Sequence, residues 1–251
     1  GNAPVGRVVV MSELLLRFDR HSKDDTVPAE DEWATREDVH LALPFTAMCA
    51  AHAMGVEVVS LSPIGQGPRA SIIAEALARE GIVDAGPRVE GCDNGFLSPP
   101  LKQYGASVSS GMTEMPEDAW DEAIRTLGPS DVLFVDGGIV SQAVLAACEH
   151  ALAHLPDHVR IILDASQGHV RQRSLPNDNV LIMVGYDSAE SLCRSVSYER
   201  PSGDCTKYPR TGADKVRSDF HQYALVRAQT HESYLARAVQ DKYSSDGEVT
   251  R

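Results

Sequence analysis

The chain has 251 residues, of which 43% are hydrophobic, and this length and composition suit one α/β domain with a sizeable core. The formal net charge of −13 argues against nucleic acid or an anionic membrane as a partner, because their phosphates would be repelled. The five cysteines form no Cys-x-x-Cys pair, and neither a membrane-spanning apolar run nor a signal peptide is visible. We therefore expect a cytoplasmic protein without disulfides.

The first part of the chain alternates buried strands with amphipathic helices. Residues 7–11 and 56–61 are nearly continuous apolar runs, the pattern of strands buried on both faces of a parallel sheet. Helices are expected over residues 41–55 and 70–80, where apolar side chains recur at helical spacing. Residues 21–38 are charged and aperiodic, so we expect an exposed loop there.

Two segments are expected to form a small β lid. Residues 88–112 hold short apolar stretches between glycines and serines, which is the pattern of short strands joined by turns. Residues 13–20 follow the first strand after a polar break and supply the other part of the lid. Residues 115–127 then form a short helix with acidic side chains in its first turn.

A second strand–helix–strand unit predicts a ligand site. Residues 131–136, 141–155 and 159–163 read as strand, helix and strand, the order of a right-handed βαβ crossover. Gly138 and Asp164 come just after the two strands. Ligands of open parallel sheets bind at the carboxyl ends of the strands, so these two residues are candidates for contact with a ligand.

The C-terminal part is predicted to contain one more parallel strand and two closing helices. The strand covers residues 180–185, and the helices cover residues 213–227 and 231–243. The remaining tail is polar, and we expect it to be loose.

A polar turn with small residues precedes the first of these helices. Thr211, Gly212 and Ala213 open the helix, and the unpaired N–H groups of a helix start favour a phosphate or another anion. Asp214 follows in the same turn, where a carboxylate can take a proton from a hydroxyl. The alternative interpretation is an ordinary helix start with an acidic first turn.

This turn resembles the Thr-Gly-Ala-Gly-Asp signature of the ribokinase (PfkB) family of sugar and nucleoside kinases, in which the Asp is the catalytic base. Aligned without a gap, Lys215 falls on the catalytic Asp; with a one-residue deletion, Asp214 becomes the base. Residues 12–17, Ser-Glu-Leu-Leu-Leu-Arg, resemble the Gly-Glu-Leu-Leu-Leu-Arg opening of the 2-keto-3-deoxygluconate kinases in this family. An Arg17 near the substrate would suit a carboxylate, although a surface arginine on an edge strand is the alternative.

The resemblance implies a three-layer ribokinase-like α/β fold with a mainly parallel central sheet, forming a single domain over residues 1–251. It implies ATP-dependent phosphoryl transfer to a sugar or sugar-acid hydroxyl with Mg²⁺, and a homodimer through the lid is a further expectation. It assigns the base to Asp214, the nucleotide and phosphate side to Gly185, Thr211, Gly212, Ala213 and Lys215, and the substrate side to Arg17, Thr46, Gly138 and Asp164. It assigns no metal ligand.

Several positions depart from the family pattern. Leu41, Ala42 and Thr46 replace a Gly-Gly pair and an Asn at the substrate, and Gly65-Gln66-Gly67 replaces a Gly-Asp-Asp turn. One expected strand-and-helix unit, with its Asn-x-x-Glu motif for Mg²⁺ and phosphate, is not found between Asp164 and residue 180. These changes leave two alternatives, a divergent kinase using Asp214 or a non-catalytic binding protein on the kinase scaffold. A dinucleotide-dependent enzyme is a third, weakened because no Gly-x-Gly-x-x-Gly follows the first strand.

Overall fold

The computed structural model describes residues 6–21, 36–41, 43–98, 107–109, 111–164, 180–185, 223–227, 233–237 and 248–250. Its centre is a nine-stranded sheet in the order β13-β12-β11-β10-β9-β8-β1-β4-β5. The strands are β1 (Val8–Met11), β4 (Val58–Ser60), β5 (Val83–Asp84), β8 (Val132–Asp136), β9 (Arg160–Asp164), β10 (Val180–Gly185), β11 (Tyr223–Arg227), β12 (Ser233–Arg237) and β13 (Glu248–Thr250). All neighbours from β5 to β11 pair in parallel, and β12 and β13 are antiparallel.

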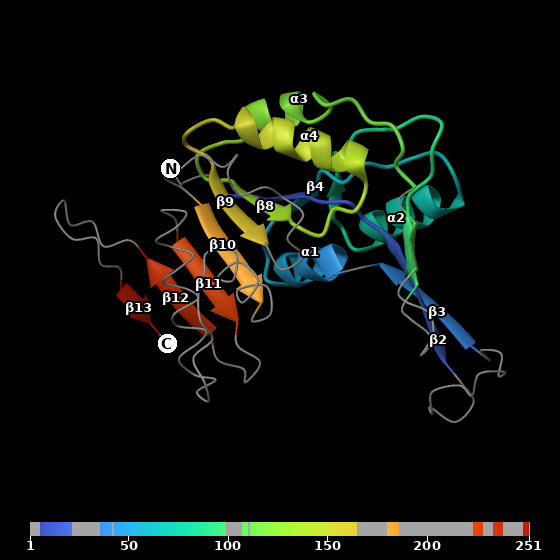
Figure 1. The fold of residues 1–251 in the computed structure, drawn as a ribbon, viewed down its shortest axis with the longest axis horizontal. Coiled ribbons are helices and arrows are strands. Elements are labelled where there is room, and N and C mark those ends of the chain that lie inside the picture. Colours follow the sequence, from blue (N-terminus) through green and yellow to red (C-terminus); the bar gives the residue numbers. More distant parts are fainter. Residues whose placement is uncertain are drawn as a thin grey trace, which may run out of the picture.

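Four described helices cover the two faces of this sheet (Figure 1). They are α1 (Leu43–Ala53), α2 (Pro68–Arg79), α3 (Asp121–Arg125) and α4 (Gln142–Ala153). Alternate residues of β1 explain the layering, because Val9 packs in the core shared with α3 and α4, whereas Val10 packs in the core shared with α1 and α2. The predicted three-layer α/β fold with a mainly parallel central sheet is therefore confirmed.

The helix α2 shows why the local sequence folds as it does. Ile73 and Leu77 lie on its inner face and are fully buried, as the helical spacing predicts. The residue before the helix is Gly67, which has no side chain to cap it, and Asp93 supplies the acceptors instead. The helix ends where Gly81 adopts a φ of 71°, a left-handed conformation that favours glycine.

The lid is a separate four-stranded sheet in the order β3-β2-β6-β7. Its strands are β2 (Leu16–His21), β3 (Arg36–Leu41), β6 (Phe96–Ser98) and β7 (Ser107–Ser109). Figure 1 shows β2 and β3 extending away from the helices and the central sheet. The loop expected over residues 21–38 is wrong at both ends, because His21 belongs to β2 and pairs with Arg36, the first residue of β3.

The C-terminal prediction of two helices is wrong where the structure describes it. Tyr223–Arg227 forms β11, which pairs in parallel with β10, and Ser233–Arg237 forms β12. The tail expected to be loose contains β13, paired with β12. The physical reason is tertiary, because the free edge of β10 provides backbone partners that outweigh the helical spacing of the local sequence. Consequently β11, and not β10, is the last parallel strand.

Candidate functional site

Two aspartates meet at the carboxyl ends of neighbouring parallel strands. Asp136 ends β8 and Asp164 ends β9, and the two are register partners. The turn after β8 is tied to both, because the Gly137 N–H donates to the Asp164 carbonyl oxygen at 2.8 Å and the Gly138 N–H donates to Asp136 Oδ1 at 3.0 Å. The structure thus places the predicted residues Gly138 and Asp164 together, in the position where open parallel sheets bind ligands.

Asp136 is the acidic group of this site that the sequence interpretation missed. Burial raises its pKa from the ordinary 3.8 to about 6, the Gly138 N–H opposes this rise, and the charges of Asp164 and Glu13 add to it. A carboxyl group with such a pKa changes protonation near neutral pH, so it can accept or donate a hydrogen bond to a ligand hydroxyl. The available signal was an acidic residue ending an apolar run directly before Gly137-Gly138.

Glu13 follows the carboxyl end of β1, the strand adjacent to β8, and is only 2% exposed. Its Oε2 accepts hydrogen bonds from the N–H groups of Val140 at 2.9 Å and Ser141 at 2.8 Å, the two residues before α4. Its Oε1 is buried and has no hydrogen-bond partner within the described part of the chain. Burial raises the pKa of Glu13, and the two backbone hydrogen bonds act against that rise.

Asn94 fastens the lid to the central sheet beside this site. It is fully buried, and its Oδ1 accepts from the Gly65 N–H at 2.9 Å. Its Nδ2 donates to the Pro63 carbonyl at 3.0 Å and to the Leu14 carbonyl at 3.4 Å. One side chain therefore links the segment after β1, the segment after β4 and the segment entering β6, which ties the base of the lid to the central sheet.

The remaining predicted site residues are placed as follows. Arg17 lies half-buried on β2 in the lid, and Thr46 is exposed in the first turn of α1. Gly185 ends β10, the strand adjacent to β9. Thr211, Gly212, Ala213, Asp214 and Lys215 lie outside the described residues.

The described residues provide no metal centre of their own. No group of three or more His, Cys, Asp or Glu side chains among them is arranged to hold a metal ion. Cys49, Cys92 and Cys148 are free thiols, and burial raises the pKa of Cys148 to about 12, which keeps it protonated and unreactive. No helix in the described ranges is long and apolar enough to cross a membrane.

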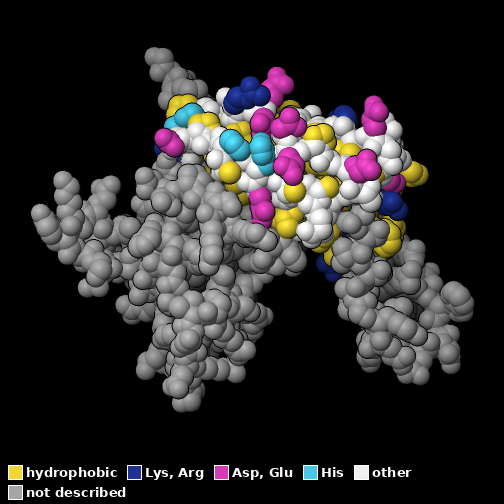
Figure 2. Space-filling model, turned by 45° about the horizontal axis from the view of Figure 1, so that its top comes forward, with side chains coloured by type: hydrophobic (Ala, Val, Ile, Leu, Met, Phe, Trp, Pro, Cys, Tyr) yellow, Lys and Arg dark blue, Asp and Glu magenta, His cyan; other side chains and the backbone are white. Residues whose placement is uncertain are grey.

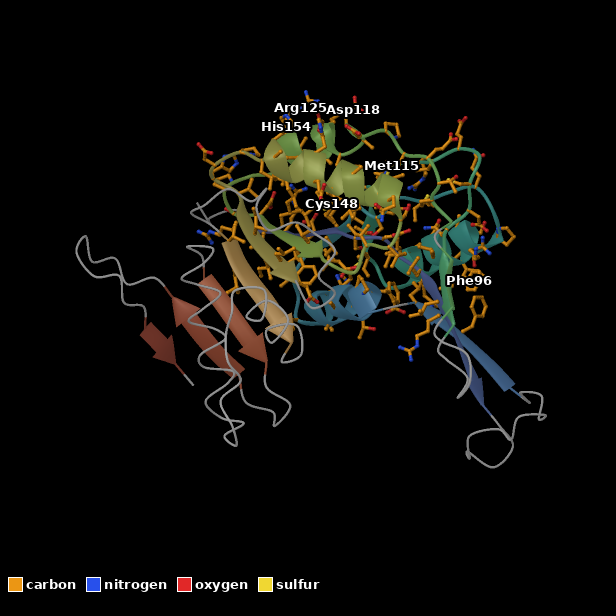
Figure 3. The ribbon with its side chains drawn as sticks, viewed as in Figure 1. Phe96, Met115, Asp118, Arg125, Cys148 and His154 are labelled. Carbon is orange, nitrogen blue, oxygen red and sulfur yellow. The ribbon has the colours of Figure 1, made fainter. Side chains whose placement is uncertain are left out.

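A cavity beside α3 includes neither Asp136 nor Asp164. This cavity of about 320 Å³ opens between α3 and the sheet, lined by Arg7, Leu61 and Leu127 among others, and contains none of the predicted site residues. Acidic and histidine side chains gather over α3 and α4 (Figure 2). Figure 3 shows Cys148 between α4 and the sheet, with His154 on the outer side of the helix.

Comparison with known proteins identifies the fold. No protein-family model and no curated protein matches the sequence. Ribokinase from Thermotoga maritima matches with a TM-score of 0.66 at 14% identity, covering 98% of this chain and 78% of that one. The 2-dehydro-3-deoxygluconokinase of the same organism matches with a TM-score of 0.62 at 15% identity, covering 97% and 79%. Fructokinase from Halothermothrix orenii gives 0.61 at 12%, covering 95% and 86%. The chain therefore has a ribokinase-like fold, shared with carbohydrate kinases.

Proposed function

We propose that this chain is a carbohydrate kinase that transfers a phosphoryl group from ATP to a hydroxyl of a sugar or sugar acid. The observation that carries the proposal is that Asp136 and Asp164 lie together at the ends of adjacent strands. The chain also shares its fold with the matched sugar kinases. A ligand rich in hydroxyl groups suits this site, because carboxylates and backbone groups bind hydroxyls by directional hydrogen bonds.

The acceptor sugar would bind at the strand ends, below the lid. Asp136 and Asp164 would accept hydrogen bonds from its hydroxyls, and the turn at Gly138 would present backbone groups to it. Arg17, on the lid strand β2, would pair with the carboxylate of a sugar acid, and Thr46 at the start of α1 would contribute a hydroxyl. A homodimer through the lid is part of the same proposal.

The phosphate side of the site is proposed on Thr211 to Lys215 and on Gly185. Asp214 is the acid in the motif that could act as base, and the N–H groups of Gly212 and Ala213 would then donate to the phosphate. In the ungapped alignment Lys215 takes the base position, and a protonated ammonium binds phosphate but cannot accept a proton. Binding would then survive where transfer does not.

The strand order suggests where the strand unit thought to be missing lies. Because β11 is the last parallel strand and antiparallel strands follow it, β10 can take the place of the unit expected before the nucleotide strand. In that arrangement β11 would border the nucleotide, and Gly185 at the end of β10 would not. Asp187 and Glu190 follow β10 in the sequence at the spacing of the expected Asn-x-x-Glu motif. Carboxylates suit Mg²⁺. The described residues do not themselves fit a metal site, so no catalytic step is assigned to the ion here.

A non-catalytic binding protein is the second candidate, and one observation favours it. Leu41, which stands where the family has glycine, is 7% exposed at the end of β3. A bulky residue there removes the close approach of the backbone to a sugar that glycine permits. Under this alternative the scaffold still binds a sugar or nucleotide, but transfer does not occur.

One experiment separates the two candidates. ADP formation is measured with ATP, Mg²⁺ and a panel of sugars and sugar acids, and ligand binding is measured in parallel by calorimetry. For a kinase, Asp214→Asn abolishes turnover with the fold intact, and Asp136→Asn lowers affinity for the acceptor. The exposed Asp118→Asn, on the far surface near α3, is the matched control. Binding without turnover by the parent protein favours the second candidate, and unchanged turnover in Asp214→Asn excludes that residue as the base.

A further inference from the structure

The chain passes between the central sheet and the lid at segments that meet one another. Residues 12–15 lead from β1 into β2, and residues 111–115 return from β7 toward α3. Glu13, in the outgoing segment, accepts a hydrogen bond from the Ser141 N–H at 2.8 Å. The Ser141 hydroxyl donates to the carbonyl of Met112, in the returning segment. Both segments are therefore anchored on the residue directly before α4.

This arrangement differs from an ordinary helix cap. A serine before a helix usually caps it with its own hydroxyl, but Ser141 makes no such bond. Its hydroxyl is used by Met112, and the acceptor for the N–H groups of Val140 and Ser141 comes from Glu13, 127 and 128 positions away. A local cap would not require a buried carboxylate, and Glu13 Oε1 has no hydrogen-bond partner among the described residues. A structural role alone therefore leaves the free-energy cost of burying Glu13 unexplained.

The loop between β8 and α4 is held at both ends by carboxylates. Asp136 and the Asp164 carbonyl hold its beginning at Gly137 and Gly138, and Glu13 holds its end at Ser141. Only Ile139 and Val140 lie between Gly138 and Ser141, and Val140 also donates to Glu13, so a movement of one end is passed to the other. We propose that Glu13 is a positioning residue that couples the lid to the strand-end site by fixing the 137–141 loop. The proposal rests on the function assigned to that site above.

The charges that face Asp136 can be named. Asp164 comes from β9 and Glu13 from the segment after β1, and both raise the pKa of Asp136. The buried thiol of Cys148 on α4 faces it as well, because the charge of Asp136 contributes to the raised pKa of Cys148. The first turns of α4 and α1 contain no acidic residue. The only titratable side chains of α1 are Cys49 and His52, in its later turns. Removing the charge of Glu13 while keeping its shape therefore shifts the titration of Asp136 to lower pH.

The test uses Glu13→Ala and Glu13→Gln in the full chain, with the exposed Glu75→Gln on α2 as the control. Amide hydrogen exchange is followed by NMR at Val140, Ser141 and Leu16, the last of which donates to the Gly95 carbonyl inside the lid. In Glu13→Ala, exchange is expected to be about tenfold faster at all three amides, because the loop and the lid lose their common anchor. In Glu13→Gln the amide oxygen still accepts the bonds, so exchange stays near that of the parent.

The titration of Asp136, followed by carboxyl carbon NMR, gives the second measurement. Its midpoint is expected to fall in Glu13→Gln and to stay unchanged in Glu75→Gln. Faster exchange confined to Val140 and Ser141, or an unchanged midpoint in Glu13→Gln, overturns the proposal. If Glu13→Ala does not fold, the Glu13→Gln titration decides. Neither hydrogen exchange nor the titration needs turnover, so a failure of the proposed kinase activity is detected separately. If the protein does turn over a substrate, Glu13→Ala is expected to raise KM for the acceptor about tenfold, with a smaller effect on kcat.

Discussion

Replacing Asp136 with asparagine should stabilise the protein above neutral pH while weakening its proposed ligand site. The folded state raises the pKa of this carboxyl group from 3.8 to about 6, mainly by burial. The folded protein therefore binds the proton more tightly than the unfolded chain does. Stability is lost as pH rises from about 4 to about 6, and above that range the folded protein carries the full cost of the buried charge.

The size of this effect follows from the pKa difference. About two pKa units at 1.36 kcal/mol each set an upper limit of about 3 kcal/mol. Because Asp136 is only partly buried and solvent screens its charge, we expect Asp136→Asn to gain about 1–2 kcal/mol at pH 7.5. The asparagine oxygen can still accept the bond from the Gly138 N–H, so the turn is preserved.

The assay is urea unfolding of parent and variant at pH 4, 5, 6 and 7.5. The free-energy difference between them should grow through this range and level off above pH 6. Asp118→Asn, at an exposed position, should show a flat difference. A variant that is less stable than the parent at pH 7.5, or a difference that does not change with pH, would refute the reasoning. A gain in stability together with a loss of ligand affinity is the expected signature of a functional residue.

Three further substitutions test the packing and the ion pairs by urea unfolding. Asp93→Ala should cost about 1–2 kcal/mol, because it removes the acceptor for the first N–H groups of α2. Trp120→Phe should cost about 2–4 kcal/mol, because the buried indole N–H donates to the Leu61 carbonyl at 2.7 Å. Arg7 lowers the pKa of Asp131 to about 2 by hydrogen bonding. Asp131→Asn should therefore cost about 1–2 kcal/mol at pH 7, a value kept low because Arg7 is one-third exposed and solvent screens the ion pair. The difference in stability between parent and variant should shrink as pH falls from 4 toward 2.

Much of the fold could be predicted from local patterns. The strand at Val8–Met11 is marked by a continuous apolar run and the helix over Pro68–Arg79 by apolar residues at helical spacing, and the structure confirms both. The segment Tyr223–Arg227 was mispredicted because it continues a helical spacing from Val216 and Phe220. Its pairing with β10 joins residues about 40 positions apart, so the pattern of neighbouring residues does not predict it. The strand Arg36–Leu41 was missed because four of its six residues are charged or histidine.

The candidate site was predictable only in part. Gly138 and Asp164 could be placed at strand ends because topology alone decides that position. Asp136 and Glu13 could not be selected, since their importance depends on burial and on the register of neighbouring strands. A buried acid differs from a surface acid in its surroundings, which a single sequence does not show.

Sugar-dependent ADP formation tests most directly whether the strand-end site is the acceptor site of a sugar kinase. The purified chain is incubated with ATP and Mg²⁺, and ADP is measured for each member of a panel of neutral sugars and sugar acids. We expect ADP formation with one class of acceptor, with KM raised by Asp136→Asn and unchanged by Asp118→Asn. ADP formation that no acceptor stimulates, or an acceptor KM that Asp136→Asn leaves unchanged, would contradict this assignment.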